Sequence, residues 1–528
     1  MNKQKIIQQI EKLIEVGIAL SNEQDTELLL EKILLSAKSI TGADGGSLYR
    51  VDGDNIRVSI LFSDKLNIYL GGRSGNNVDL PEIPLYLANG MDNLANVVSF
   101  VYHNQHPVNI ANVYDPENAF DFSGPKLFDQ QYDYHTKSLL TIPLKDHKSD
   151  VIGVLQLVNA IDDQTCAIVE FDDISQNITL AMASQAAIVL TQQHLIADLE
   201  KLFQSLVRLV ASAIDQKSPY TGAHSRRVPV ITMMLAEAVH DVDHGELKDF
   251  SMSDADRYEL EISAWLHDCG KITTPEFVMD KATKLETIFD RIELVETRFE
   301  VLKRDREIEL LRSKLTALEA GQTVDTDVDQ RFEQAIAQID DDLAFIRRVN
   351  QGSEFMSSDD QGRIEAISRS SWRLNQRTLA LLSEQEVYNL CIARGTLTQE
   401  ERAVINNHIV ATINILDAIE FPRHLKRVPE FAGGHHERMD GKGYPKGLRR
   451  EQMSVQARIM GIADVFEALM DSDRPYKKGK KLSEALAILK NMKETGHIDP
   501  DIYDVFIEKR VYKKYAEQFV AAEQIDVD

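Results

Sequence analysis

Apolar residues in the first 190 positions follow two periods, one helical and one strand-like. The stretch TELLLEKILLSAKSITGAD predicts an amphipathic helix that ends near Gly42. Two β-hairpins are predicted by GGSLYRVDGDNIRVSILF and SLLTIPLKDHKSDVIGVLQLVNA, because each holds two β-rich runs around a polar turn. A closing helix is expected from about Asp172 to Leu190. We therefore expect an N-terminal helix over residues 1–20 and an α+β sensor-like domain over residues 21–190.

The next segment, residues 191–215, carries an apolar seam. Its apolar residues fall at intervals of 4, 3, 4, 3 and 4: Leu195, Leu199, Leu202, Leu206, Leu209 and Ala213. This a/d spacing is typical of a coiled coil. A helix that packs on its own domain is the alternative interpretation. We favour a parallel coiled coil between two chains, and therefore a homodimer.

The second half of the chain, residues 216–528, is expected to be an all-α domain. Within it, one apolar series runs from Leu285 through Ile288 to Leu302, and a second runs from residue 332 to residue 346. The spacings of 3 and 4 predict two long helices, joined by a turn, that form a helical hairpin. The hairpin belongs to an insert over about residues 284–394, for which we expect a structural or interaction role.

The bulk composition limits the classes of partner. A formal net charge of −25 argues against nucleic-acid and anionic-membrane binding. The three cysteines lie far apart, which suits a reducing compartment and argues against a disulfide framework or a thiolate zinc site. The N-terminus does not resemble a signal peptide, and the most apolar helical stretch, residues 178–190, is too short to span a bilayer. A cytoplasmic protein is expected.

Histidines and aspartates gather at four points of the second half: His267 and Asp268, His408, His435 and His436, and Asp464. Neighbouring helical residues project about 100° apart, so an adjacent pair reaches into one cavity in two directions. Two such doublets favour a multi-metal cluster over a single-metal site. Imidazole and carboxylate without thiolate favour iron or manganese.

The first domain resembles a GAF domain. The resemblance rests on the opening helix and on GADGGSLYRVD, SLLTIPL, VIGVLQLVNA and FDDISQNITLAMASQAAIVL. It implies a regulatory role and an unidentified small-molecule ligand.

The second half resembles the HD-GYP branch of the HD superfamily of metal-dependent phosphohydrolases, over roughly residues 200–280 and 395–515. The motifs that carry the resemblance are SPYTGAHSRRV, HDCGKI, HHERMDGKGYP, ARIMGIADVFEAL and DRPYKK. The resemblance implies a bacterial signalling enzyme that hydrolyses cyclic di-GMP to linear pGpG, GMP or both. It implies a centre of two or three divalent metal ions.

The same resemblance implies a role for each matching residue. The metal ligands would be His267, Asp268, His408, His435, His436 and Asp464, with Asp268 as the bridge. Lys271 would contact the scissile phosphate, Arg474 and Lys477 would hold phosphate oxygens, and Tyr444 would shape the pocket. A third metal is left open, with His224 and Asp215 as its candidate ligands.

Two features depart from the family pattern. LMDSDRPY has one extra residue before Arg474, and the hairpin interrupts what is usually a short connection. Two alternatives to the phosphodiesterase therefore stay open, a catalytically weak receptor or scaffold for a cyclic dinucleotide and a hydrolase of another cyclic dinucleotide.

Overall fold

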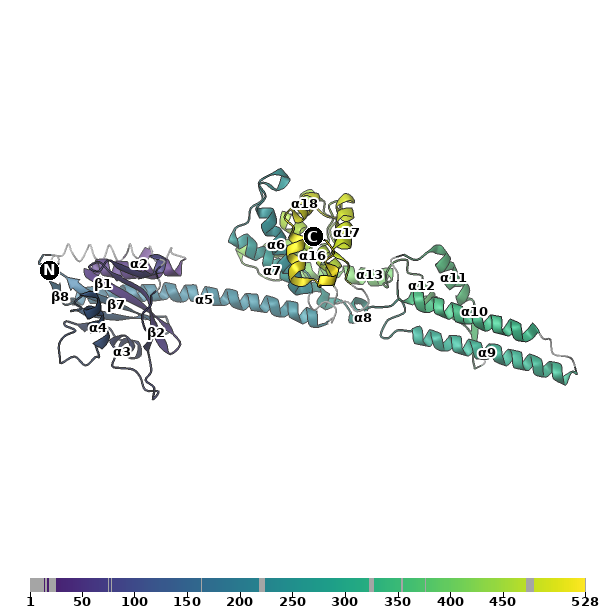
Figure 1. Cartoon of the computed structure of the whole chain (residues 1–528), viewed down its shortest axis with the longest axis horizontal. Coiled ribbons are helices and arrows are strands. Elements are labelled where there is room, and N and C mark those ends of the chain that lie inside the picture. Colours follow the sequence, from purple (N-terminus) through teal and green to yellow (C-terminus); the bar gives the residue numbers. More distant parts are fainter. Residues whose placement is uncertain are drawn as a thin grey trace. The chain divides into compact units, whose positions relative to one another are not determined.

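The protein divides into two compact units, Met1–Leu202 and Phe203–Asp528 (Figure 1). The computed structural model describes residues 14, 17, 18, 25–74, 76, 78–162, 164–217, 224–321, 327–352, 355–375, 377–471 and 479–527. The helix predicted for residues 1–20 lies almost wholly outside the described residues. Within the described ranges, the helices are all too short or too polar to cross a membrane.

The first unit is built on an eight-stranded antiparallel sheet with the order β3-β2-β1-β7-β6-β5, to which β4 and β8 add at β2 and β7. The strands are β1 Ala43–Asp52, β2 Asn55–Ser63, β3 Ile68–Gly71, β4 Ile83–Pro84, β5 Val108–Ile110, β6 Leu139–Lys145, β7 Val151–Ile161 and β8 Ile168–Val169. The helices are α2 Thr26–Thr41, α3 Val97–Asn104 and α4 Ser123–Tyr132, followed by the start of α5.

Alternation along β1 places a hydrophobic core on each face of this sheet. Leu48 packs with α2 and α5, whereas the next residue, Tyr49, packs with α3. Gly42, at a φ of 67°, ends α2 in the left-handed conformation that glycine adopts without strain. The predicted helix, hairpins and α+β sensor-like fold are confirmed.

A single helix, α5 (Asp173–Lys217), covers both the predicted closing helix and the predicted linker. The five leucines of the seam are between 50% and 63% exposed. A different face of α5 is buried within the second unit, where Val207 and Ile214 pack against Leu266 and Leu416. The described chain therefore leaves the a/d seam uncovered.

The second unit is mainly helical, as predicted. Its helices are α6 His224–His240, α7 Asp254–Leu266, α8 Glu276–Met279, α9 Ile292–Glu319, α10 Asp327–Asn350, α11 Ser358–Ser368, α12 Glu384–Leu390, α13 Gln399–Asn406, α14 His408–Asp417, α15 Val428–Gly433, α16 Val455–Met470, α17 Leu482–Glu494, α18 Pro500–Glu508 and α19 Val511–Phe519. Its largest core packs α6, α7 and α16 against α17, α18 and α19.

The insert has a separate hydrophobic core, formed by α9, α10, α11 and α12. A hydrogen bond of 3.0 Å from the Thr396 hydroxyl to the Lys281 carbonyl brings the two ends of the insert together. The hairpin of α9 and α10 is confirmed, but the expected helical position of Ile288 is wrong. Ile288 is 93% exposed and lies in a turn before α9, where Thr283 donates a hydrogen bond to Asp290.

The insert also contains a two-stranded ribbon that the sequence patterns did not predict. β9 (Ser371–Leu374) pairs with β10 (Arg377–Ala380) in antiparallel register. Seven of its eight residues are exposed, so the ribbon lacks the alternation of buried and exposed residues that marks a half-buried strand.

Candidate metal centre

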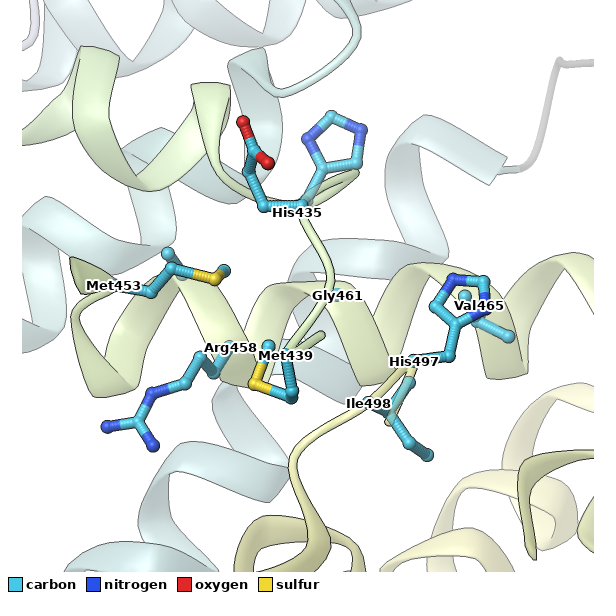
Figure 2. A pocket seen from close by; sticks show the side chains of 10 residues that line it. His435, Met439, Met453, Arg458, Gly461, Val465, His497 and Ile498 are labelled. Atoms are coloured by element: carbon cyan, nitrogen blue, oxygen red, sulfur yellow. The ribbon is translucent and has the colours of Figure 1, made fainter. Parts of the chain in front are cut away.

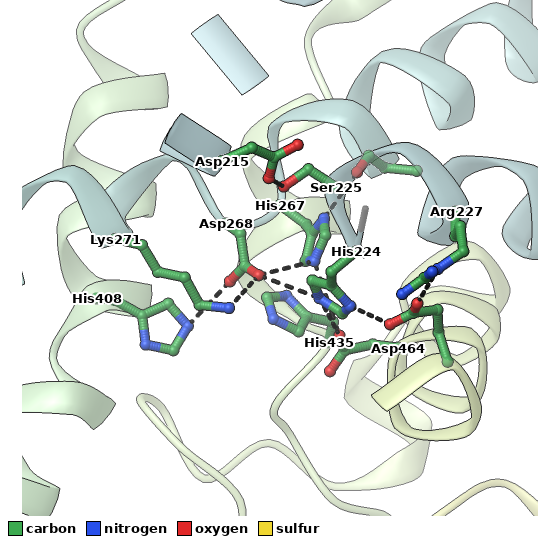
Figure 3. Close-up of polar contacts among 12 residues, drawn as sticks. Asp215, His224, Ser225, Arg227, His267, Asp268, Lys271, His408, His435 and Asp464 are labelled. Atoms are coloured by element: carbon green, nitrogen blue, oxygen red, sulfur yellow. Dashed lines mark hydrogen bonds and ion pairs between the residues drawn. The ribbon is translucent and has the colours of Figure 1, made fainter. Parts of the chain in front are cut away.

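The six residues predicted as metal ligands lie together in the second unit. Figure 3 labels five of them, His267, Asp268, His408, His435 and Asp464, and the sixth, His436, has its ring centroid 5.1 Å from that of His408. His267 is the C-cap of α7, a helix that starts with a capping box between Ser253 and Asp256, and Asp268 follows His267. His408 begins α14, the doublet His435–His436 follows α15, and Asp464 lies on α16. Four separate elements of the helical core therefore aim their polar side chains at one point.

Three of the histidines are oriented in the same way. The Nδ1 atoms of His267, His408 and His435 each donate a hydrogen bond to the carbonyl three residues earlier, over 2.7, 2.5 and 2.6 Å. This contact fixes the tautomer that leaves a lone pair on Nε2. The local backbone thus prepares three imidazoles to act as ligands through the atom that faces the cluster.

Asp268 stands between two groups of histidines. Its Oδ2 lies 3.3 Å from His224 Nε2 and 3.1 Å from His267 Nε2. Its Oδ1 lies 3.3 Å from His408 Nε2, which in turn is 3.2 Å from His436 Nε2. The two oxygens of one buried carboxylate therefore face two different sets of imidazoles, which is the arrangement of a bridging ligand.

The donor atoms fit divalent metal ions. Two sets of ligating atoms each lie within 4.8 Å of one another, one from His408, His435 and His436 and one from His224, His267 and Asp268. The Nε2 atoms of His267 and His435 and the Oδ1 of Asp268 are buried without a hydrogen-bond partner. Buried polar atoms normally have partners, and a metal ion would satisfy these.

The electrostatics of the cluster favour deprotonated ligands. Burial lowers the pKa of His436 to about 4, and burial with the neighbouring His436 holds the pKa of His435 well below its ordinary value. Burial opposes ionisation of Asp268, yet the charge of Lys271 and the hydrogen bond from His224 hold its pKa well below the usual range. At neutral pH two imidazoles are therefore neutral and Asp268 is ionised, which are the forms that bind metals.

His224 joins the cluster from α6. Its Nε2 is 3.2 Å from Asp464 Oδ1, and its Nδ1 bonds to Glu467. Burial opposes its charge, but hydrogen bonds to Asp268, Asp464 and Glu467 raise the pKa of His224 well above the ordinary value. A divalent cation between these groups would replace the proton as the positive charge.

Glu467 and Arg227 support His224 and were missed in the sequence patterns. Glu467 accepts from Arg227 Nε at 2.5 Å, and Arg227 also donates to Asp471 at 2.6 Å. Glu467 follows Asp464 by three positions on α16, so both carboxylates share one face of the helix. That spacing was the available signal.

Lys271 reaches the cluster from the short helix η3 (Cys269–Thr273), where its ammonium pairs with Asp268 Oδ2. Gly270 allows η3 to lie directly against α14, since a Cβ there would be 2.0 Å from the His408 carbonyl oxygen. The amide of Gly270 also donates to the Thr412 hydroxyl at 2.9 Å. Lys271 is partly exposed, so it can meet both the cluster and a ligand from solvent.

The loop that follows the histidine doublet folds back over it. The Tyr444 ring stacks on His436 with centroids 4.8 Å apart, and its amide donates to the His436 carbonyl at 3.3 Å. The buried carboxylate of Glu437 accepts from the amides of Lys446 and Leu448, at 2.7 and 2.8 Å. Glu437, another residue that the sequence patterns missed, therefore anchors the loop that carries Tyr444.

A small pocket adjoins His435 on the side of α16 (Figure 2). It is lined by Glu437, Met439, Met453, Arg458, His497 and Ile498, among others. Asp268 and Lys271 do not line it, so this pocket is separate from the approach to Asp268.

The remaining predicted residues are not placed in the cluster. Asp215, at the end of α5, is buried, and its Oδ1 accepts the Ser225 hydroxyl at 2.5 Å; it is in neither set of ligating atoms found among the described residues. Arg474 and Lys477 lie outside the described residues.

Two family models match the chain. Residues 25–190 match the GAF domain and residues 379–502 match an HD domain. The second match includes His408, His435, His436 and Asp464, and it begins after Asp268. Both predicted resemblances are confirmed.

Several curated proteins are similar to parts of this chain. The 3'3'-cGAMP-specific phosphodiesterase 3 of Vibrio cholerae is 23% identical over 331 residues, which cover 63% of this chain and 42% of that protein. A cyclic di-GMP phosphodiesterase of Pseudomonas aeruginosa is 49% identical over 74 residues, which cover 14% of this chain and 17% of that protein. A cyclic di-GMP phosphodiesterase of Thermotoga maritima is 35% identical over 124 residues, covering 23% and 33%. The chain thus spans less than half the length of these relatives.

Proposed function

Because the chain carries a GAF domain and an HD domain, we propose that it is a metal-dependent phosphodiesterase. Its substrate would be cyclic di-GMP, its product linear pGpG, GMP or both, and its regulator the GAF domain. We assign the sensor to residues 21–190, the linker to residues 191–215 and catalysis to residues 216–528, with an insert at about 284–394.

The position of Asp268 between two sets of imidazoles is the observation that carries the proposal. Two divalent ions would be held by His267, Asp268, His408, His435, His436 and Asp464, with His224 as a further ligand or the site of a third ion. Iron or manganese suits this set of nitrogen and oxygen donors. When bound, such ions supply Lewis-acid charge and an activated water for attack on phosphorus.

The protein's own groups would bind and orient the phosphodiester. Lys271 carries a positive charge at the edge of the cluster and would stabilise the developing charge on the phosphoryl oxygens. Arg474 and Lys477 belong to RPYKKGKK, a basic run in an otherwise acidic chain, and would hold the second phosphate. Tyr444, fixed on His436, would form one wall of the substrate site.

The choice of cyclic dinucleotide has two candidates. Relatives named for cyclic di-GMP and relatives named for 3'3'-cGAMP both align with this chain, and the longest of the alignments described above is with a cGAMP-specific protein. Purified protein reconstituted with Fe²⁺ or Mn²⁺ should be given each dinucleotide, with the products separated by chromatography. Linear products from cyclic di-GMP would support the proposal. If only 3'3'-cGAMP is hydrolysed, the enzyme is a phosphodiesterase whose substrate is 3'3'-cGAMP and not cyclic di-GMP.

We also propose that two chains pair through α5. The seam leucines are exposed while Val207 and Ile214, on another face, are buried within the second unit, so packing among the described residues does not use the seam. Replacing Leu202 and Leu206 with glutamate should give a monomer in light scattering. A variant that stays dimeric would locate the interface elsewhere.

A further inference from the structure

Lys217, the last residue of α5, holds the segment that carries Lys271. Its ammonium donates to the carbonyls of Lys271, Ile272 and Thr274, with distances of 3.4 Å to the first and 2.6 Å to the last. An ammonium has three N–H donors, and three carbonyls of one short segment occupy them here. The contact is therefore a clamp on the end of η3.

The clamp fits the local electrostatics. Carbonyl groups at the C-terminal end of a helix carry partial negative charge and lack intrahelical donors. Lys217 supplies a positive charge at the end of its own helix and also at the end of η3. Directly after η3, the amide of Thr274 donates to the Lys271 carbonyl at 3.0 Å, so the clamp reinforces an existing turn.

The other side of η3 is held separately. Gly270 packs against α14 and bonds to Thr412, while His267 is oriented by Ala264. The metal-ligating doublet therefore has supports of its own. Loss of the Lys217 clamp would loosen the backbone of Lys271 more than that of the ligands that precede it.

We infer that Lys217 is a positioning residue, which sets the place of Lys271 in the proposed reaction by fixing the carbonyls of residues 271–274. This inference rests on the proposed function of Lys271. Since Lys217 ends the helix that begins in the first unit, a displacement of α5 along its axis would move the clamp and shift Lys271. The clamp thus gives the sensor a direct connection to the phosphate-binding lysine.

The test uses the full-length, metal-loaded protein. Lys217→Met removes the three donors at similar side-chain length, and Lys217→Arg keeps a cation. We expect Lys217→Met to lower kcat on cyclic di-GMP about tenfold, with KM changed by less than about threefold. Metal content should be unchanged, and Lys217→Arg should recover most of kcat. Gln216→Met, at the adjacent exposed position, is the matched control.

A double-mutant cycle separates positioning from general destabilisation. In a Lys271→Ala background, Lys217→Met should lower kcat by less than about twofold, because the residue through which it acts is gone. An unchanged kcat in the single variant would overturn the inference. The same tenfold loss in both backgrounds would also overturn it, since it would reveal a structural effect independent of Lys271.

Hydrogen exchange keeps the test independent of the proposed activity. Amides of residues 269–274 should exchange faster in Lys217→Met than in the wild type, and at the wild-type rate in Lys217→Arg. If the wild type does not turn over cyclic di-GMP, the proposed function fails. The hydrogen-exchange rates of residues 269–274 would still show whether Lys217 holds this segment. Unchanged exchange in Lys217→Met would overturn the clamp itself.

Discussion

The metal centre and the insert both bury charged side chains, but they differ in how those side chains are satisfied. In the insert, the fully buried Lys284 donates to the carbonyls of Leu390 and Ile392 at 2.9 and 2.8 Å. At the metal centre, the Nε2 atoms of His267 and His435 have no hydrogen-bond partner. Among its described residues the insert has a single such unpartnered atom, Nη2 of Arg291, whereas the centre gathers three, on His267, His435 and Asp268. Three unpartnered polar atoms in one cluster indicate a ligand more strongly than one isolated atom does.

The surroundings of the two regions strengthen this contrast. Arg298 forms two hydrogen bonds to Glu386, at 2.7 and 3.0 Å, which link α9 to α12 within the insert. At the centre, Asp268 instead faces the imidazoles of His224, His267 and His408. A bound metal ion would add positive charge beside this carboxylate and stabilise it further. The described part of the insert thus pairs Lys284 and Arg298 within the chain, whereas a metal ion at the centre would satisfy atoms that the chain leaves unpartnered.

The largest expected effect is from Asp268→Ala. Because the two oxygens of Asp268 face different sets of imidazoles, the variant should lose metal and turnover together. Elemental analysis and product formation measure the two losses. Asp243→Ala, the same change at an exposed loop position, should keep both. Full metal content in Asp268→Ala would contradict the bridging role.

Lys271→Ala should separate metal binding from turnover. A protonated lysine cannot ligate a metal, so the metal content should stay at the wild-type level. Turnover should fall about 10²–10³-fold, the range for one preorganised charge-stabilising donor. Lys248→Ala, at an exposed position, is the control. A loss of metal equal to that of Asp268→Ala would give Lys271 a structural role.

Lys284 should show its burial in the pH dependence of stability. Burial lowers its pKa to about 8 in the folded protein, from an ordinary value of 10.5. Between these values the unfolded chain binds the proton that the folded chain has released, so the free energy of unfolding rises with pH. Relative to Lys284→Met, the insert should gain about 2 kcal/mol between pH 7 and about pH 9.5.

Urea unfolding followed by the fluorescence of Trp372, which packs against the core of the insert, measures this gain. Trp265→Phe in both proteins removes the other tryptophan of the chain. Parallel pH profiles for Lys284 and Lys284→Met proteins would mean that the ammonium is solvated.

The smallest effect on the centre is expected from removing the insert. Since Thr396 bonds to Lys281, a short glycine linker can replace residues 284–394. The metal content should be unchanged, because the insert contributes no ligand from its described residues. Regulation or partner binding should change instead. Loss of metal from a folded deletion variant would show that the insert supports the centre.

The candidate metal ligands could be predicted from the sequence, but the residues that hold them and Lys271 in place could not. Adjacent histidines and aspartates are rare, so HDCGK and GGHHE stand out against any helical background. Glu467 and Lys217 are common residue types on helices, and their roles depend on contacts with residues far away in the chain. Patterns of apolar residues likewise predicted the hairpin, but Ile288 continued the spacing into a turn that polar contacts of Asp290 define.

The most direct test of the account is a metal titration of the apoprotein, with bound metal and cyclic di-GMP turnover measured on the same samples. If Asp268 bridges two ions, turnover should stay near zero until the second equivalent of Fe²⁺ or Mn²⁺ binds, and should then rise with the metal content. Protein that binds at least two metals and cyclic di-GMP, yet yields no linear product, would contradict the phosphodiesterase and leave a receptor for the dinucleotide.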